Sequence, residues 1–242
     1  MPVSIKGQCA IVVGASSGIG RATAVLLARD GVRVLAAARR EDRLEELRKE
    51  MQGEGFDVAV RAMDASDAAQ AERLGAEALE LFGKVDILVY ATGTNTPDRS
   101  LQRLNTEIWD HLVHVNLSGA YYVTRSVLPS MRAAASGHLI YVSSISGLAP
   151  DVSGAAYQAG KRGMVGLAHA IRVEEKQHGI RTCVICPGLV DTELLNLRPV
   201  KTPAEIVAKA MQPEDVAEAI LAVLRLPPRA AVPEMQIMPT YL

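Results

Sequence analysis

Tyr157 and Lys161 stand four residues apart near the start of an expected helix, so their side chains share one helix face. Ser144 lies 13 residues before Tyr157, where the strand-like run 138–143 ends. A hydroxyl at the carboxyl end of a strand lies where ligands bind in an open α/β sheet. A phenol can donate or accept a proton, but its ordinary pKa of about 10 is high for a base at neutral pH. Chemistry at Tyr157 therefore needs neighbours that lower this pKa.

A glycine-rich loop, Gly14–Ala15–Ser16–Ser17–Gly18–Ile19–Gly20, follows the first apolar run and opens the first helix. Its glycines permit a tight turn and a close approach of the backbone to a pyrophosphate, and the helix N-terminus supplies free N–H groups. The spacing is G-x-x-x-G-x-G rather than the commoner G-x-G-x-x-G. A plain strand-to-helix turn is the alternative, but the position after the first strand of an alternating pattern favours dinucleotide binding.

The second strand-like run ends in Arg39 and Arg40, where NAD-binding proteins usually place an acidic residue for the ribose 2′-hydroxyl. The strand end therefore lacks the carboxylate that would repel a 2′-phosphate. Guanidiniums bind phosphate in bidentate fashion. The alternative is that the arginines merely open a charged helix. For Arg40 this alternative is as good as phosphate binding, and for Arg39 it is weaker than phosphate binding. The pattern predicts NADP(H) as the preferred cofactor, with NAD(H) as the second possibility.

Short apolar runs alternate with longer helical stretches along the chain, which is typical of a parallel sheet covered on both faces. We expect an α/β, three-layer, doubly wound Rossmann fold with a mostly parallel seven-stranded sheet, formed by one NAD(P)-binding domain over 1–242. A substrate-loop segment is expected at about 189–212, with a capping box at 202–205 and a further helix from Pro213. Strands are expected at 9–13, 33–37, 57–62, 85–90, 138–143, 182–186 and 235–238, and helices at 18–30, 43–54, 68–82, 106–134 and 155–178.

Composition excludes several classes of protein. The chain has 242 residues, 49% of them hydrophobic, and a formal net charge of -1, which gives no electrostatic reason to expect nucleic acid or an anionic membrane as a partner. It has no apolar run long enough for a membrane span and no signal-peptide pattern at its start. The chain has three cysteines, and Cys183 and Cys186 lie in one apolar run, which indicates buried thiols rather than a metal or redox pair. We therefore expect a cytoplasmic protein without a metal site.

Motifs along essentially the whole chain resemble those of the short-chain dehydrogenase/reductase family. They are GASSGIG after the first strand, Asp64 after the third, Asn116 in the long helix, SSISG, YQAGK and PGLVDT. The resemblance implies that Tyr157 donates a proton to a carbonyl oxygen, or accepts one in alcohol oxidation. Lys161 would lower the pKa of the phenol and hold the nicotinamide ribose, Ser144 would hold the substrate oxygen, and Asn116 would order a water in a proton relay. The nicotinamide would supply the hydride.

The resemblance also implies a set of cofactor contacts, in which Asp64 and Ala65 flank the adenine. The last four residues of the set would line the nicotinamide. Asp64 as a helix cap and Pro187–Gly188 as an ordinary turn remain alternatives. The full set is Gly14, Ser16, Ser17, Gly18, Ile19, Gly20, Arg39, Arg40, Asp64, Ala65, Ala91, Gly93, Tyr157, Lys161, Pro187, Gly188, Val190 and Thr192.

The chain departs from the family after the fourth strand, where it reads Tyr90–Ala91–Thr92–Gly93 instead of the usual Asn-Asn-Ala-Gly. Ala91 and Gly93 still let a ribose approach the backbone. The first Asn normally helps to knit the central sheet, which Tyr90 cannot do in the same way. Ser17 also stands where many NADP-preferring members carry a basic residue, so the prediction of NADP rests mainly on Arg39.

The expected substrate is a small carbonyl or alcohol compound. Arg198 and Lys201 could meet a carboxylate or an acyl-carrier phosphate, although a solvated surface position is the favoured interpretation. There is some resemblance to 3-oxoacyl-carrier-protein reductases and to NADP-dependent 3-hydroxy acid dehydrogenases, and neither singles out a substrate. The residues expected to face it, beyond Ser144 and Tyr157, are Thr94, Asn95, Ile145, Pro150, Val152 and the segment 189–200.

Two other classes of function are weaker alternatives. A non-catalytic NADP(H)-sensing binding protein tends to lose the tyrosine or the lysine, and both are present here. An epimerase or dehydratase usually has a larger substrate domain than this chain can hold. The apolar faces of the helices at 106–134 and 155–178 predict assembly. The resemblance implies a homotetramer, with a homodimer as the alternative.

Overall fold

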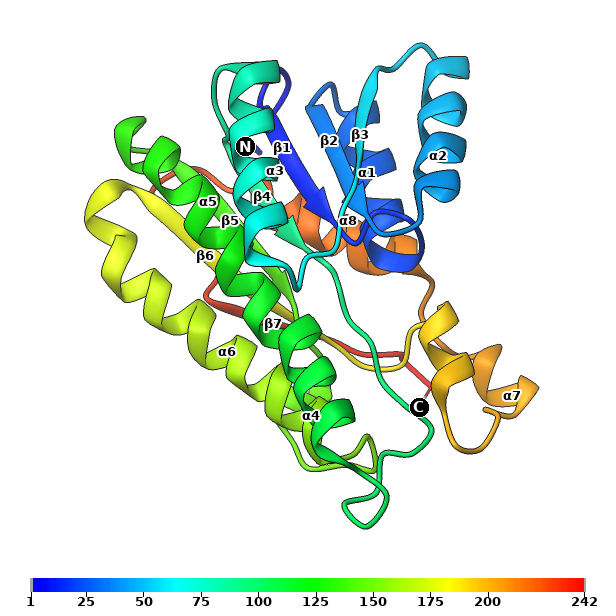
Figure 1. The fold of residues 1–242 in the computed structure, drawn as a ribbon. Helices are drawn as coiled ribbons and strands as arrows, with labels where there is room; N and C mark the ends of the chain where they lie inside the picture. The colour runs from blue at the N-terminus through cyan, green and yellow to red at the C-terminus, as the bar shows by residue number, and fades with distance from the viewer. Residues whose placement is uncertain (1, 242) are drawn as a thin grey trace.

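The computed structural model describes residues 2–241 and has three layers, with helices on both faces of a central sheet (Figure 1). The strand order is β3-β2-β1-β4-β5-β6-β7, and every neighbouring pair is parallel. The predicted doubly wound Rossmann fold is confirmed, including its edge strand near 235–238. The strands are β1 (Cys9–Val13), β2 (Arg33–Ala38), β3 (Val58–Ala62), β4 (Ile87–Tyr90), β5 (Gly137–Val142), β6 (Ile180–Pro187) and β7 (Glu234–Ile237).

Each face of the sheet has its own apolar core, which is why the inner strands are apolar at nearly every position. Cys183 and Cys186 illustrate the two faces, because they pack into different cores. Both thiols are buried, as predicted. Helices α1 (Gly18–Arg29), α2 (Glu41–Gly53) and α8 (Pro213–Leu224) cover one face, and α3 (Ala68–Phe82), α5 (Gly119–Ala133) and α6 (Ala155–Glu175) cover the other.

The helix expected over 106–134 is interrupted by a π-helical turn. It consists of α4 (Thr106–Val113), the π-helical turn η1 (His114–Ser118) and α5. Asn116 lies in this turn, and its amide donates to the carbonyl of Leu112 one turn earlier. A π-turn inside a helix is a frequent feature of functional sites. Likewise, α6 ends at Glu175, and the last predicted turn is the 3₁₀ helix η3 (Lys176–His178).

The predicted substrate-loop segment folds into short pieces between β6 and α8. It contains the 3₁₀ helix η4 (Glu193–Leu197) and the single turn α7 (Ala204–Val207), and α8 then begins at Pro213 as predicted. The predicted capping box at 202–205 is wrong, because Pro203 is the residue that precedes α7 and the hydroxyl of Thr202 accepts from Arg198 Nη1 at 3.1 Å instead.

Strand order reverses between β1 and β4, since β2 and β3 lie to one side of β1 and the later strands to the other. Ligands of open α/β sheets bind in the crevice outside the carboxyl ends of the strands at such a switch point. Within residues 2–241, no helix combines the length and the apolar character that a bilayer crossing requires.

Candidate active site

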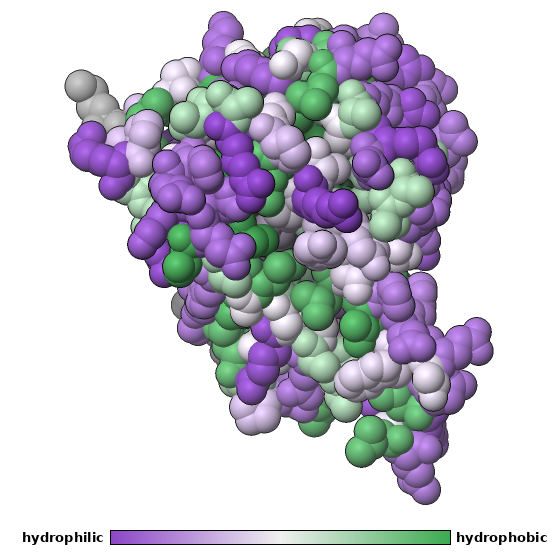
Figure 2. All heavy atoms as spheres, turned by 60° about the vertical axis from the view of Figure 1, so that its left-hand side comes forward, coloured by the Kyte–Doolittle hydropathy of each residue, from purple (hydrophilic) through white to green (hydrophobic). Residues whose placement is uncertain are grey.

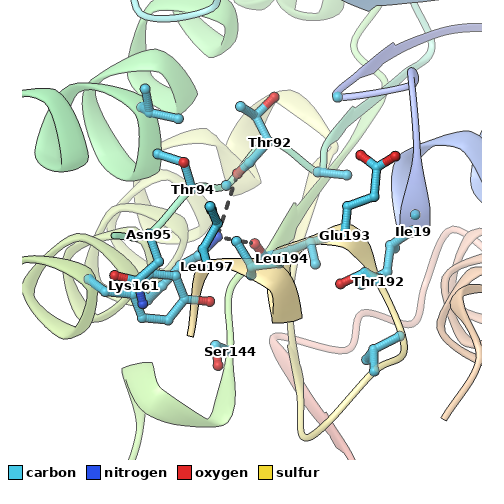
Figure 3. Close-up of a pocket in the computed structure, with 18 of the residues that line it drawn as sticks. Ile19, Thr92, Thr94, Asn95, Ser144, Lys161, Thr192, Glu193, Leu194 and Leu197 are labelled. Carbon is cyan, nitrogen blue, oxygen red and sulfur yellow. Dashed lines mark hydrogen bonds between the residues drawn. The ribbon is translucent and has the colours of Figure 1, made fainter. Parts of the chain in front are cut away.

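A cavity of about 530 Å³ opens at the carboxyl ends of the strands, at the switch point. The structure brings all the predicted site residues to this cavity except Gly20 and Asn116. Figure 3 shows Ile19 and Thr192 on one side, and Ser144 and Lys161 on the other. Apart from Gly20 and Asn116, the residues that the resemblance assigned to the cofactor and to catalysis share one continuous space.

The glycine loop brings three backbone segments into close contact. Gly14 has a φ of +92°, and a Cβ there would lie 2.8 Å from the carbonyl carbon of Ala91. A Cβ on Gly20 would lie 2.3 Å from the oxygen of Gly14, which leaves room for hydrogen only. Gly20 therefore packs α1 against the loop and does not face the cavity.

The N-terminus of α1 can accept an anion. Ser17 precedes the first helical residue and its side chain does not cap the helix, so the helix dipole points at the cavity without a capping side chain. A pyrophosphate fits such a site, because backbone N–H groups and the dipole both favour negative charge. The donor set and the glycine cradle thus suit a dinucleotide.

The two arginines after β2 lie at the cavity rim and differ in their contacts. Arg40 forms an ion pair with Glu193 at 2.7 Å and donates to the hydroxyl of Ser17 at 2.6 Å. This contact holds the pKa of the Glu193 carboxyl below its usual value. Arg39 is exposed, and among the described residues it has no ion-pair partner. A 2′-phosphate at this rim could bind the guanidinium of Arg39, which forms no ion pair among the described residues, and that of Arg40, which already pairs with Glu193.

Asp64 forms a turn and does not cap a helix. Its Oδ1 accepts from the backbone N–H of Ser66 at 2.9 Å and from the Ser66 hydroxyl at 2.7 Å. Burial raises the pKa of Asp64, but the hydrogen bonds from Ser66 act in the opposite direction, and the net pKa lies below its usual value. The cap of α3 is Asp67, so the helix-cap interpretation of Asp64 is wrong.

Tyr157 and Lys161 lie in the first turns of α6, which starts directly after Gly154 (φ +91°). Lys161 Nζ donates to the carbonyl of Val142 at 3.0 Å and lies 5.8 Å from the centroid of the Tyr157 ring. Burial raises the pKa of Tyr157 to about 12, although a hydrogen bond with Ser144 acts to lower it. Burial also lowers the pKa of Lys161 to about 8. The phenol is therefore protonated at neutral pH in the chain alone.

A chain of hydrogen bonds through Ser146 to Asp151 orients the Ser144 hydroxyl. The Ser144 hydroxyl accepts from the backbone N–H of Ser146 at 3.1 Å and donates to the Ser146 hydroxyl at 3.2 Å. The Ser146 hydroxyl in turn donates to the carboxylate of Asp151. Both Ser146 and Asp151 line the cavity, and sequence reasoning missed them.

Asn116 is fully buried behind the cavity wall and holds the loop that follows β4. Its side chain donates to the carbonyl of Thr94 at 2.9 Å and accepts from the Thr94 N–H at 3.1 Å. With the bond to Leu112, both amide N–H groups have partners, and only one lone pair on Oδ1 remains free for a water. The side chain therefore positions the loop beside Lys161, which the sequence did not predict.

Tyr90 replaces the usual Asn with a different kind of contact. Its ring is fully buried, and its hydroxyl donates to the carbonyl of Val115 at 2.8 Å, next to Asn116 in the π-turn. A Cβ on Gly119 would lie 2.3 Å from this hydroxyl oxygen, so the phenol fits because residue 119 is glycine. Tyr90 thus ties β4 to the π-turn across the sheet face.

The substrate end of the cavity is only partly as predicted. Thr94, Asn95 and Ile145 line it, whereas Pro150 and Val152 do not, and Val152 is 92% exposed. Arg198 lines the cavity and Lys201 does not. Arg99, from the loop between β4 and α4, also lines it. Sequence reasoning missed Arg99, since no motif marks it.

Within residues 2–241, no three His, Cys, Asp or Glu residues come together as a metal site would require. Burial raises the pKa of the Cys183 thiol to about 12 and that of Cys186 to about 11. Thiols with such pKa values stay protonated and are poor ligands and nucleophiles at neutral pH.

Comparisons with known proteins agree with this geometry. The sequence model of the family described as short chain dehydrogenase matches residues 8–201. An uncharacterized oxidoreductase of Staphylococcus haemolyticus is 32% identical over 236 residues, which cover 97% of this chain and 98% of that protein.

Two solved structures are similar over nearly their whole length. An alcohol dehydrogenase from the archaeon Thermococcus sibiricus, complexed with 5-hydroxy-NADP, has a TM-score of 0.87 and 30% identity, covering 97% of both chains. An actinorhodin polyketide ketoreductase variant with NADPH has a TM-score of 0.89 and 29% identity, covering 99% of this chain and 98% of that one. On its sequence, fold and relatives, this chain belongs to the short-chain dehydrogenase family and is an oxidoreductase that acts on CH–OH and C=O groups.

Proposed function

We propose that this chain is an NADP(H)-dependent carbonyl reductase or alcohol dehydrogenase in which Tyr157 is the general acid and base. The observation that carries the proposal is the shared cavity of Tyr157, Ser144 and Lys161 with the glycine loop and Arg39. The same space can hold a dinucleotide at one end and a small carbonyl compound at the other. A sensor that only binds the cofactor would not need this catalytic set.

The preference for NADP(H) is supported by Arg39 and Arg40 directly after β2 and by the ligands of the two similar structures, which are 5-hydroxy-NADP and NADPH. Arg39 and Arg40 would hold the 2′-phosphate, the α1 N-terminus the pyrophosphate, and Asp64 and Ala65 would flank the adenine. The bound nicotinamide supplies the hydride. Pro187, Gly188, Val190 and Thr192 would line the nicotinamide site.

The burial of Tyr157 favours its role as a proton donor. Because burial raises the pKa of this phenol to about 12, it is protonated at neutral pH and ready to donate to a carbonyl oxygen. Ser144 would hold the same oxygen and stabilise the charge that develops on it. The reduction direction therefore needs no prior deprotonation, whereas alcohol oxidation needs the phenolate.

Lys161 and Asn116 would support this transfer. Lys161 has a pKa of about 8 and is mostly charged at neutral pH, so it can attract electron density toward the phenol oxygen when the proton leaves. Asn116 would act through the loop at Thr94 and through a water on its free Oδ1 lone pair.

Assembly as a homotetramer, or a homodimer, is also proposed, with each chain acting as one domain in the cytoplasm. Trp109 of α4, Tyr121 of α5 and Val173 of α6 are large apolar side chains that are 37%, 48% and 54% exposed. In Figure 2 the side formed by α5 and α6 comes forward, and apolar side chains gather over its lower half. A symmetric contact would cover such a face.

The test is the oxidation of NADPH and of NADH, followed by absorbance, with aldehydes, ketones and oxo acids as substrates. We expect turnover with NADPH that exceeds turnover with NADH and is absent in Tyr157→Phe. Tight NADPH binding without turnover on any carbonyl compound would favour the sensing function instead. A preference for NADH would contradict the role of Arg39.

A further inference from the structure

Two arginines at the substrate end of the cavity form no ion pair with any residue that the structure describes. Arg99 and Arg198 come from segments far apart in the sequence, and both line the cavity together with Ser144 and Tyr157. Within residues 2–241, neither guanidinium lies within ion-pair distance of a carboxylate, although nine other arginines do. Two unpaired positive charges next to the reacting phenol need an explanation.

Arg99 is held in place by carbonyl groups of two different loops. It is half-buried, its Nε donates to Thr96 O at 3.1 Å, and its Nη2 donates to Leu197 O at 2.6 Å. Figure 3 shows that Leu197 and Leu194 of η4 face the same space as Ser144 and Lys161. A guanidinium has five N–H donors, so these two bonds leave three for a ligand.

Arg198 follows η4 and is held by a single contact, from its Nη1 to the Thr202 hydroxyl at 3.1 Å. Burial and the charge of Arg198 lower the pKa of Arg99, and both arginines also act to lower the pKa of Tyr157. The two guanidiniums are therefore close enough to repel each other and to act on the phenol. An anion between them would relieve this repulsion.

Asp151 is a carboxylate at this end of the cavity, and its oxygens accept hydrogen bonds from two serines. It accepts from the backbone N–H of Ser153 at 2.8 Å, from the Ser153 hydroxyl at 3.0 Å and from the Ser146 hydroxyl. It forms no ion pair with Arg99 or Arg198. Glu193 also lines the cavity, but it pairs with Arg40. The charge of Asp151 acts on Arg99 without forming an ion pair, so two positive charges face one negative charge at the substrate end.

We propose that Arg99 and Arg198 bind a carboxylate of the substrate, so that this enzyme reduces oxo acids, or oxidises the matching hydroxy acids, in preference to neutral carbonyl compounds. The inference rests on the proposed function, since Tyr157 and Ser144 would hold the carbonyl oxygen. A planar guanidinium matches a carboxylate in bidentate geometry. Holding both ends of a small substrate would fix which face of its carbonyl group meets the nicotinamide.

The kinetic test compares short-chain oxo acids with their methyl esters, which keep the carbonyl group and lose the charge. In Arg198→Met we expect KM for the acids to rise about 10- to 100-fold, as for a lost charge-assisted hydrogen bond, with little change for the esters. Matched controls are Lys201→Met and Arg103→Met. Both remove a positive charge from the same two segments at residues that do not line the cavity, and neither should change KM.

Arg99 needs a variant that separates charge from the link between loops. Arg99→Lys keeps the charge but cannot donate to both Thr96 and Leu197 in the same way. If Arg99 binds the carboxylate, Arg99→Met loses acid turnover selectively and Arg99→Lys recovers part of it. Equal losses with acids and esters in both variants would show a purely structural link and would overturn the inference for Arg99.

A binding measurement decides the inference without turnover. Calorimetry on the NADP⁺-saturated protein compares malonate, an unreactive dicarboxylate, with its neutral diamide malonamide. We expect malonate alone to bind, and Arg198→Met to weaken it at least about tenfold. Absence of malonate binding, or ester turnover equal to acid turnover, would overturn the carboxylate site and leave the proposed function intact. Failure of the wild type with every acid and ester would overturn the proposed function, and malonate binding would still decide the anion site.

Discussion

The two halves of the cavity, one proposed for the cofactor and the other for the substrate, are built differently. The proposed cofactor half consists of strand ends and the turns that follow them, and its lining residues are 14, 16–19, 38–40, 63–65, 91–93, 187–190 and 192. The proposed substrate half consists mainly of loops and short 3₁₀ turns, and its lining residues are 94, 95, 99, 144–146, 151, 153, 193–195, 197 and 198. Strand ends are fixed by the sheet, whereas the loops are fixed by side-chain contacts such as those of Arg99. The first half suits a constant ligand, and the second can vary with the substrate.

Lys161 stands between the two halves, and its removal should have the largest effect. We expect Lys161→Met to lower kcat/KM by about 10²- to 10⁴-fold, since a group that supports proton transfer is lost. NADPH binding, measured by fluorescence titration, should weaken much less. Activity within tenfold of the wild type would contradict the role of Lys161.

The same variant should unfold at an equal or higher denaturant concentration at neutral pH. Burial lowers the pKa of Lys161 to about 8 from its usual value near 10.5, so the folded chain releases this proton before the unfolded chain does. The wild type therefore gains stability as pH rises from about 8 toward about 10.5, and the difference from Lys161→Met should shrink over that range. Urea unfolding at several pH values tests this. A clearly less stable variant at neutral pH would contradict the cost of burying the charge.

Arg39→Ser should break the cofactor half selectively. We expect the Kd for NADPH to rise about 10- to 100-fold while the Kd for NADH stays the same, because only NADPH carries the 2′-phosphate. Arg43→Ser is the matched control, since Arg43 pairs with Glu46 on α2 and does not line the cavity. Equal losses of NADPH and NADH affinity in Arg39→Ser would argue against phosphate recognition.

Tyr90→Phe should weaken the contact between β4 and the π-turn, next to both halves of the cavity. Removing the hydroxyl leaves the buried carbonyl of Val115 without its partner, which costs about 1–3 kcal/mol of stability. The π-turn that holds Asn116 would then be less well positioned, so kcat should fall modestly while NADPH affinity stays near the wild-type value. Thermal unfolding and steady-state kinetics check both effects. An unchanged stability would show that this hydrogen bond contributes nothing.

The smallest effect is expected where the two halves touch. The Arg40–Glu193 ion pair is about half exposed, so it contributes about 0.2–1 kcal/mol. Because a 2′-phosphate would compete with Glu193 for Arg40, Glu193→Gln should tighten NADPH binding roughly twofold to fivefold at low salt and leave NADH binding unchanged. Weaker NADPH binding in this variant would show that Glu193 orders Arg40 for the phosphate.

The sequence predicted which residues line the proposed cofactor half far better than which residues line the proposed substrate half. Glycine spacing, strand-end arginines and the Tyr157–Lys161 pair are local patterns, so they could be recognised before the fold was known. Arg99 contacts Leu197, which is 98 residues away, and no local pattern encodes such a contact. The π-turn at Asn116 was also missed, because its residues fit an ordinary helical pattern.

The role of Tyr90 shows how a departure from a family motif can be compensated elsewhere. The sequence indicated only that the usual Asn contact was lost. The replacement contact to Val115 depends on the small residue at Gly119, which is distant in the chain and has no signal of its own. Substitutions of this kind become interpretable when packing distances are known.

The central claim is that Tyr157 transfers the proton, and the pH dependence of kcat/KM in both directions tests it most directly. Since burial favours the protonated phenol, carbonyl reduction should be fastest at low and neutral pH and fall as Tyr157 loses its proton, while alcohol oxidation should rise over the same range. Tyr157→Phe should abolish both rates and keep NADPH binding. A Tyr157→Phe variant that retains activity with the wild-type pH profile would show that another group carries the proton.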